Sequence, residues 1–155
     1  MAGWLDRLFR SRRKPQHGAA STGVVWQLRI ERERGAVGKL NDRLEVTLRP
    51  SVPETVVRAL QVALDELLTN VIMHSRQASG PIELRLARSA RSLDAEISYF
   101  ADEFDPTRVK EAPRATTIED SKIGGLGVPL VRALMDEFTY EYADGRNVVR
   151  LRKKC

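Results

Sequence analysis

The sequence has few of the residues that build disulfides and protein metal centres. It holds one cysteine, Cys155, and two histidines, His17 and His74, which stand far apart. A single cysteine excludes a disulfide within the chain and a cysteine cluster around zinc, and the histidine spacing does not fit a zinc site. A chain without disulfides is typical of a reducing compartment, so we expect a cytoplasmic protein.

Long apolar runs are also missing. No stretch approaches the roughly 20 apolar residues that a membrane-spanning helix needs. What is present is an ordinary globular composition, with 42% apolar and 30% charged residues in a chain of 155. This composition and length suit one domain with a sizeable core.

The positive charge is concentrated near the N-terminus. Residues 1–23 carry +4 of the net charge of +5, and the remainder mixes both signs. The basic character therefore belongs to this segment, and we expect the domain at residues 24–155 to make no direct contact with nucleic acid.

The segment at residues 1–23 combines a short amphipathic part with a polar linker. The apolar side chains that would share one helix face are Trp4, Leu5, Leu8 and Phe9. Two interpretations stay open. Residues 2–14 could form an anchor, binding weakly to the inner membrane surface or docking in a partner's groove. Alternatively, they form a tail that only makes the chain more soluble.

Beyond residue 24, hydrophobic periodicity predicts a series of strands and helices. Strands are predicted at 24–30, 81–88, 92–100, 139–143 and 147–152, and helices at 34–49, from about 52 to 75 and from the glycines at 124–127 to about 138. Pro53 marks the start of the second helix, with the capping residue left open between Ser51 and Val52.

This order of elements predicts the fold class. Strands come mostly in hairpins, and Asp144 and Gly145 form a strong hairpin-turn pair. Residues 101–123 lack periodicity, and a loop of that length is usually functional. We expect an α/β (α+β) two-layer sandwich, with a mixed, mostly antiparallel sheet and helices on one face.

The long second helix carries three polar residues at a spacing that can serve chemistry. Glu66, Asn70 and His74 recur every fourth residue and share one face beside the apolar stripe. An amide oxygen suits Mg²⁺, and a carboxylate one turn earlier could deprotonate a nucleophile. Alternatively, these residues form the polar edge of an amphipathic helix.

A glycine cluster precedes the third helix. Gly124, Gly125 and Gly127 would let backbone N–H groups approach an anion at the positive end of that helix, which is a phosphate cradle. Alternatively, they form a joint that needs positive φ. The cluster is not a Walker loop, because no Gly-Lys-Ser/Thr follows, and no strand leads directly into it as in a Rossmann motif.

A third element, Phe104-Asp105-Pro106, stands between the other two, and the combination is specific. The order Glu66-x-x-x-Asn70, hairpin, Phe-Asp-Pro, long loop and Gly-Gly-x-Gly resembles the Bergerat-type ATPase domain of the gyrase, histidine kinase and heat-shock chaperone superfamily. Within it, the chain looks like the anti-sigma-factor serine/threonine kinase branch. The resemblance covers about residues 24–152.

The resemblance implies a Bergerat ATP-binding fold with ATP and Mg²⁺ as cofactors. It implies that Asn70 coordinates the metal, that Glu66 is the general base, and that the Phe-Asp-Pro residue Asp105 belongs to the nucleotide site. It also implies that Gly124, Gly125 and Gly127 bind phosphates and that residues 107–123 act as a lid.

The sequence departs from this family at the adenine site. The family usually has Asp-x-Gly before Phe-Asp-Pro, with the Asp accepting a hydrogen bond from the adenine amino group. Here Tyr99 and Ala101 occupy those two positions. Losing one charge-assisted contact costs roughly 1.5–3 kcal/mol, about 10- to 100-fold in affinity.

Two functions follow as hypotheses. The first is an ATP-dependent serine kinase of partner-switching regulation. It would phosphorylate an anti-anti-sigma protein and bind a sigma factor or similar target, with a homodimer implied by the resemblance. The second is a nucleotide-independent module that sequesters a regulatory partner, which Tyr99 and Ala101 favour.

Overall fold

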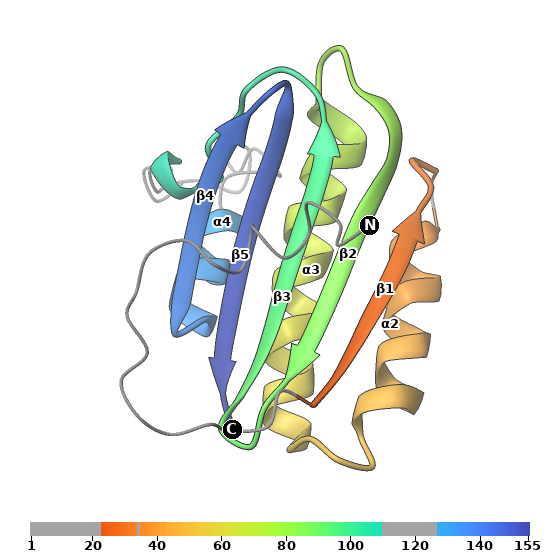
Figure 1. Cartoon of the computed structure of the whole chain (residues 1–155), viewed down its shortest axis with the longest axis vertical. Helices are drawn as coiled ribbons and strands as arrows, with labels where there is room; N and C mark the ends of the chain where they lie inside the picture. The colour runs from red at the N-terminus through yellow and green to blue at the C-terminus, as the bar shows by residue number, and fades with distance from the viewer. Residues whose placement is uncertain (1–22, 34, 110–126) are drawn as a thin grey trace, which may run out of the picture.

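The computed structural model describes residues 23–33, 35–109 and 127–155 (Figure 1). The predicted N-terminal segment, apart from Gly23, and the phosphate-cradle residues Gly124 and Gly125 lie outside these ranges. The elements are β1 (Gly23–Ile30), α2 (Ala36–Leu48), α3 (Glu54–His74), β2 (Ser79–Arg88), β3 (Ser92–Phe100), the 3₁₀ turn η1 (Pro106–Arg108), α4 (Gly127–Leu134), β4 (Glu137–Ala143) and β5 (Arg146–Lys154).

The strands form one open sheet, and the helices cover one of its faces (Figure 1). The strand order is β1-β2-β3-β5-β4, and every pairing in the described part of the chain is antiparallel. The predicted two-layer α+β sandwich is therefore confirmed, with a sheet that is antiparallel in all its described pairings rather than mixed.

The alternation of side chains in β3 shows why the sheet has one covered face. Leu93, Ala95, Ile97 and Tyr99 are buried in the core, whereas Asp94, Glu96 and Ser98 alternate with them on the other face. Successive strand residues point to opposite faces, so this pattern places an apolar surface under the helices. The central helix α3 fills that surface with Leu60, Leu64, Leu67, Leu68 and Val71.

Two predicted boundaries are wrong. Neither Ser51 nor Val52 caps α3, because Pro53 takes the capping position with extended backbone, φ −52° and ψ 137°. The helix α4 ends at Leu134 rather than near Phe138. The chain beyond it pairs with β5, beginning with Asp136 N–H donating to Arg152 O at 2.9 Å. Helical periodicity could not reveal this strand partner.

The predicted hairpin turn is confirmed. Asp144 and Gly145 connect β4 to β5 with φ of 53° and 75°. Positive φ at both central residues matches the right-handed twist of the flanking strands, and Asp-Gly adopts it at low cost.

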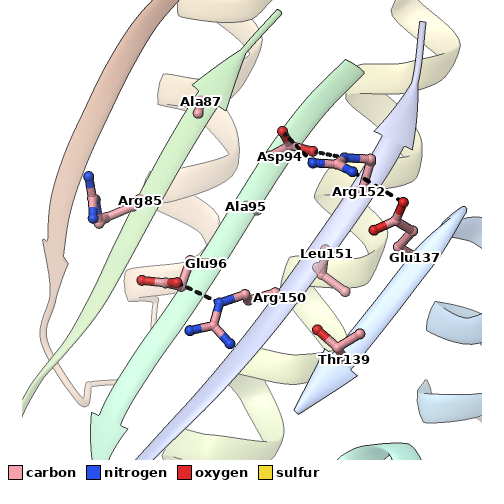
Figure 2. A pocket seen from close by; sticks show the side chains of 10 residues that line it. All are labelled: Arg85, Ala87, Asp94, Ala95, Glu96, Glu137, Thr139, Arg150, Leu151 and Arg152. Carbon is pink, nitrogen blue, oxygen red and sulfur yellow. Dashed lines mark hydrogen bonds and ion pairs between the residues drawn. The ribbon is translucent and has the colours of Figure 1, made fainter. Parts of the chain in front are cut away.

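The face of the sheet without helices carries a network of ion pairs (Figure 2). Arg150 Nε lies 2.9 Å from Glu96, and Arg152 Nε lies 2.6 Å from Asp94. A shallow hollow of about 130 Å³ lies among these side chains. The pair between Arg152 and Asp94 is partly exposed, and pairs of that kind contribute little stability, whereas Glu96 is buried and has Arg150 as its charged partner.

We predict that the buried side chains of α3 contribute much of the free energy of unfolding. Leu68 is 0% exposed and Val62, on the same helix, is 38% exposed. Leu68→Ala should lower the free energy of unfolding by about 2–5 kcal/mol, because it leaves a cavity. Val62→Ala should cost less than about 1 kcal/mol. Urea denaturation measures both, and equal losses would contradict this packing.

Candidate functional site

A cavity of about 430 Å³ lies beside the C-terminal half of α3. Its volume falls within the roughly 300–1,000 Å³ of ordinary ligand pockets. The lining residues come from α3 and the turn after it, from the segment that follows β3, and from α4: Asn70, Val71, His74, Ser75, Arg76, Asp102, Glu103, Phe104, Val109 and Val128. The cavity therefore combines apolar walls with several polar groups.

The predicted polar face of α3 contributes directly to this region. Asn70 and His74 line the cavity, one turn apart, and Asn70 is half-buried. Glu66 lies one turn earlier, against α4. The spacing read from the sequence thus places two of its three residues on the cavity wall, and the third beside the start of the neighbouring helix.

Glu66 and Gly127 are in close contact. Gly127 is the first residue of α4, and a Cβ built there would overlap the Glu66 carboxylate. A larger side chain at position 127 would therefore require the Glu66 carboxylate to move. Glu66 also lies where the positive end of the helix dipole favours a negative charge.

Asp105 is engaged in its own turn. Its Oδ1 accepts hydrogen bonds from Thr107 N–H at 2.9 Å and from Thr107 Oγ1 at 2.6 Å. Its Oδ2 lies 3.1 Å from Arg108 Nε. Because both carboxylate oxygens are occupied, Asp105 shapes the entry to η1 in this structure. A nucleotide-binding role for Asp105 stays a prediction.

Tyr99 fills the space between β3 and α3 where the resemblance places the base. Its side chain is only 2% exposed. The gap left beside it measures about 10 Å³, bordered by Leu67, Asn70 and Phe104 among others. Such a gap is about the size of one water molecule. Ala101, at the position of the family's glycine, is buried as well.

The environment of Tyr99 keeps its hydroxyl protonated. Burial raises the pKa of Tyr99 to about 12, the nearby Tyr140 adds to the rise, and Arg32 opposes it. The guanidinium carbon of Arg32 lies 5.8 Å from the centre of the Tyr99 ring. The family's carboxylate is thus replaced by a buried, neutral phenol.

Sequence reasoning missed Asn147, which lies in β5 and is 0% exposed. Its Oδ1 accepts hydrogen bonds from Phe104 N–H at 3.0 Å and from Tyr140 OH at 2.6 Å. Its Nδ2 donates to Ala101 O at 3.3 Å and to Asp102 O at 3.1 Å. All four hydrogen-bonding positions of the amide are used. The signal in the sequence is that Asn147 alternates with Val149 and Leu151, which are the apolar inward positions of this strand.

The described residues are compatible with a magnesium ion that takes most of its ligands from phosphates and water. They contain no cluster of three or more His, Cys, Asp or Glu side chains that could hold a metal. Mg²⁺ commonly takes one or two protein ligands together with phosphates and water. Asn70, with its amide beside the cavity, is compatible with such a role.

A family model described as the histidine kinase-like ATPase domain matches residues 30–153. The chain belongs to this family. The antiparallel sheet with helices on one face agrees with that assignment and confirms the expectation from the three sequence motifs.

Two bacterial proteins named as protein kinases are similar to this chain. The serine/threonine-protein kinase BtrW of Bordetella bronchiseptica is 31% identical over 94 residues, which cover 59% of this chain and 66% of BtrW, just under two thirds. The serine-protein kinase RsbW of Listeria monocytogenes is 27% identical over 132 residues, covering 81% of this chain and 83% of RsbW.

A solved structure of the RsbU and RsbW domains of Rv1364c from Mycobacterium tuberculosis has the same fold, with a TM-score of 0.59 at 12% identity. The match covers 84% of this chain and 32% of that larger one.

In the part of this chain that the structure describes, no helix is both long and apolar enough to cross a membrane.

We predict that Gly127 and Glu66 are energetically coupled. Gly127→Ala should lower the free energy of unfolding by at most about 1 kcal/mol, because the new methyl group displaces the carboxylate at the end of the flexible Glu66 side chain. In a Glu66→Ala background the same change should cost much less. A double-mutant cycle by urea denaturation measures the difference. Equal costs in both backgrounds would show that the two residues are not in contact.

We predict a specific loss of stability at alkaline pH. The pKa of Tyr99 is about 12 when folded and about 10 when unfolded. Its contribution is therefore fully present below pH 10 and is lost as the pH rises toward 12. Between pH 9 and 11 the wild type should lose roughly 1 kcal/mol more than Tyr99→Phe. Urea denaturation at both pH values tests this, and identical losses would contradict it.

Proposed function

We propose that this protein is an ATP- and Mg²⁺-dependent serine/threonine kinase of the anti-sigma-factor type. The observation that carries the proposal is the placement of Asn70 on a 430 Å³ cavity, with Glu66 one turn away against the start of α4. The names of the relatives BtrW and RsbW support a kinase activity.

In this proposal each residue of the α3 face has a separate task. Glu66 accepts the proton of the attacking serine hydroxyl, whose oxygen bonds to the γ-phosphorus of ATP while ADP leaves. Asn70 offers its amide oxygen to the metal, which neutralises phosphate charge when bound. Gly124, Gly125 and Gly127 bind the phosphates through backbone N–H groups near the start of α4.

The partners in this proposal are those of partner switching. The kinase phosphorylates a serine of a small anti-anti-sigma protein and binds a sigma factor or similar target when that antagonist is phosphorylated. It acts in the cytoplasm as a homodimer, and residues 2–14 add a weak contact with the inner membrane surface.

A second function is favoured by Tyr99. Because its side chain closes the space between β3 and α3 to about 10 Å³, a nucleotide base cannot enter there without moving the tyrosine. A module that binds a regulatory partner without binding nucleotide does not need this space, so Tyr99 could fill it without loss of function.

We expect Mg-ATP and Mg-ADP to bind with micromolar dissociation constants in calorimetric titration. Asn70→Ala should weaken Mg-ATP binding about 10-fold or more, since it removes a metal ligand. Thr69→Ala, at the exposed neighbouring position on α3, should bind like the wild type.

Absence of heat at millimolar nucleotide, from protein shown to be folded by circular dichroism, would reject the kinase and leave the nucleotide-independent module. If nucleotide binds, transfer of labelled phosphate to an anti-anti-sigma protein tests the kinase step, and Glu66→Gln should abolish it.

A further inference from the structure

The wall of the cavity after β3 carries two carboxylates and an aromatic ring. Asp102 and Glu103 line the cavity, and neither forms an ion pair with any residue that the structure describes. Phe104 is next to them, 48% exposed, and borders both the cavity and the narrow gap beside Tyr99. Carboxylate acceptors beside a half-exposed aromatic ring are suited to a flat ligand with an N–H edge.

The other acidic side chains of this region are already engaged. Glu66 is in contact with the start of α4. The carboxylate of Asp105 binds Thr107 and Arg108. Tyr99, which stands where the family has its acidic residue, is buried and offers only a phenol. Asp102 and Glu103 are therefore the acidic residues lining this cavity whose side chains have no ion-pair partner among the described residues.

Of these two, Asp102 has its backbone fixed on both sides. Its N–H donates to Arg76 O at 3.1 Å, which ties it to the turn after α3. Its carbonyl accepts from Asn147 Nδ2 at 3.1 Å, and the same amide holds the next-but-one residue, Phe104, through its N–H at 3.0 Å. A binding group is effective when its supporting bonds fix it before the ligand arrives.

We propose that Asp102 accepts a hydrogen bond from the exocyclic amino group of the nucleotide base, which packs against the ring of Phe104. This proposal rests on the proposed nucleotide binding. It assigns base recognition to the segment after β3, held by Asn147, in place of the residue at position 99. The ligand class is a purine nucleotide that carries a 6-amino group, such as ATP.

The test compares Mg-ATP with Mg-ITP, whose base has a carbonyl in place of the amino group. The wild type should bind ATP more tightly than ITP. Asp102→Asn, which replaces the charged acceptor by an amide that can also donate, should reduce the ATP-to-ITP affinity ratio at least 10-fold. Glu103→Gln is the matched control and should keep the wild-type ratio. Calorimetric titration of the full chain measures all three proteins.

The outcomes separate this inference from the proposed function. If the wild type binds neither nucleotide, both fail. If it binds ATP but Asp102→Asn keeps the wild-type ratio, or Glu103→Gln changes that ratio instead, Asp102 does not read the base, while the kinase proposal stands. Thermal unfolding of each variant shows whether it is folded, and the ratio is insensitive to the fraction of folded protein because both nucleotides bind the same preparation.

Discussion

The packing of α3 against the sheet determines where the candidate site lies. One stripe of this helix, including Leu60, Leu64 and Leu68, is buried against β2, β3 and β5. Because a helix is rigid over these few turns, burying that stripe also fixes the direction of the adjacent face, which carries Glu66 and Asn70. The core and the candidate site are thus two faces of one element. A change that rotated α3 to improve its packing would also move both polar residues away from α4 and the cavity.

The parts of the fold that depend on local pattern were predictable from the sequence. Alternation in β2 and β3, the long stripe of α3 and the Asp144-Gly145 turn each express a short-range rule, and the structure confirms them. The end of α4 was not predictable in this way, because pairing with β5 decides it over a longer distance in the sequence. The role of Asn147 was missed for the same reason. Its hydrogen-bond partners lie on β4 and after β3, and only the folded structure brings them next to it.

For the candidate site, helical spacing predicted how the residues of α3 are placed, whereas the surroundings of the residues in and after β3 depend on the fold. Glu66 and Asn70 lie as their spacing requires. Tyr99 was recognised as a departure from the family, but its burial depends on Leu67 and Phe104, which belong to other elements. The side chain of Asp105 accepts hydrogen bonds from Thr107 in this structure, and its predicted role in nucleotide binding stays a prediction. A motif gives the residue type at a position, whereas the hydrogen bonds that compete for its side chain depend on the fold.

Tyr99 and Asn147 stabilise the part of the domain where the family has its acidic residue. Tyr99 fills the space between β3 and α3, and Asn147 holds the segment that follows β3. The tyrosine ring fills the space between β3 and α3, so the core remains dense without a ligand. The amide of Asn147 then satisfies the carbonyls of Ala101 and Asp102 and the N–H of Phe104, which are polar groups beside a buried strand. An unsatisfied buried polar group costs about 1–3 kcal/mol, so this segment is strongly held in one conformation. The protein's own hydrogen bonds therefore position the segment after β3, whose residues Asp102, Glu103 and Phe104 also line the open cavity.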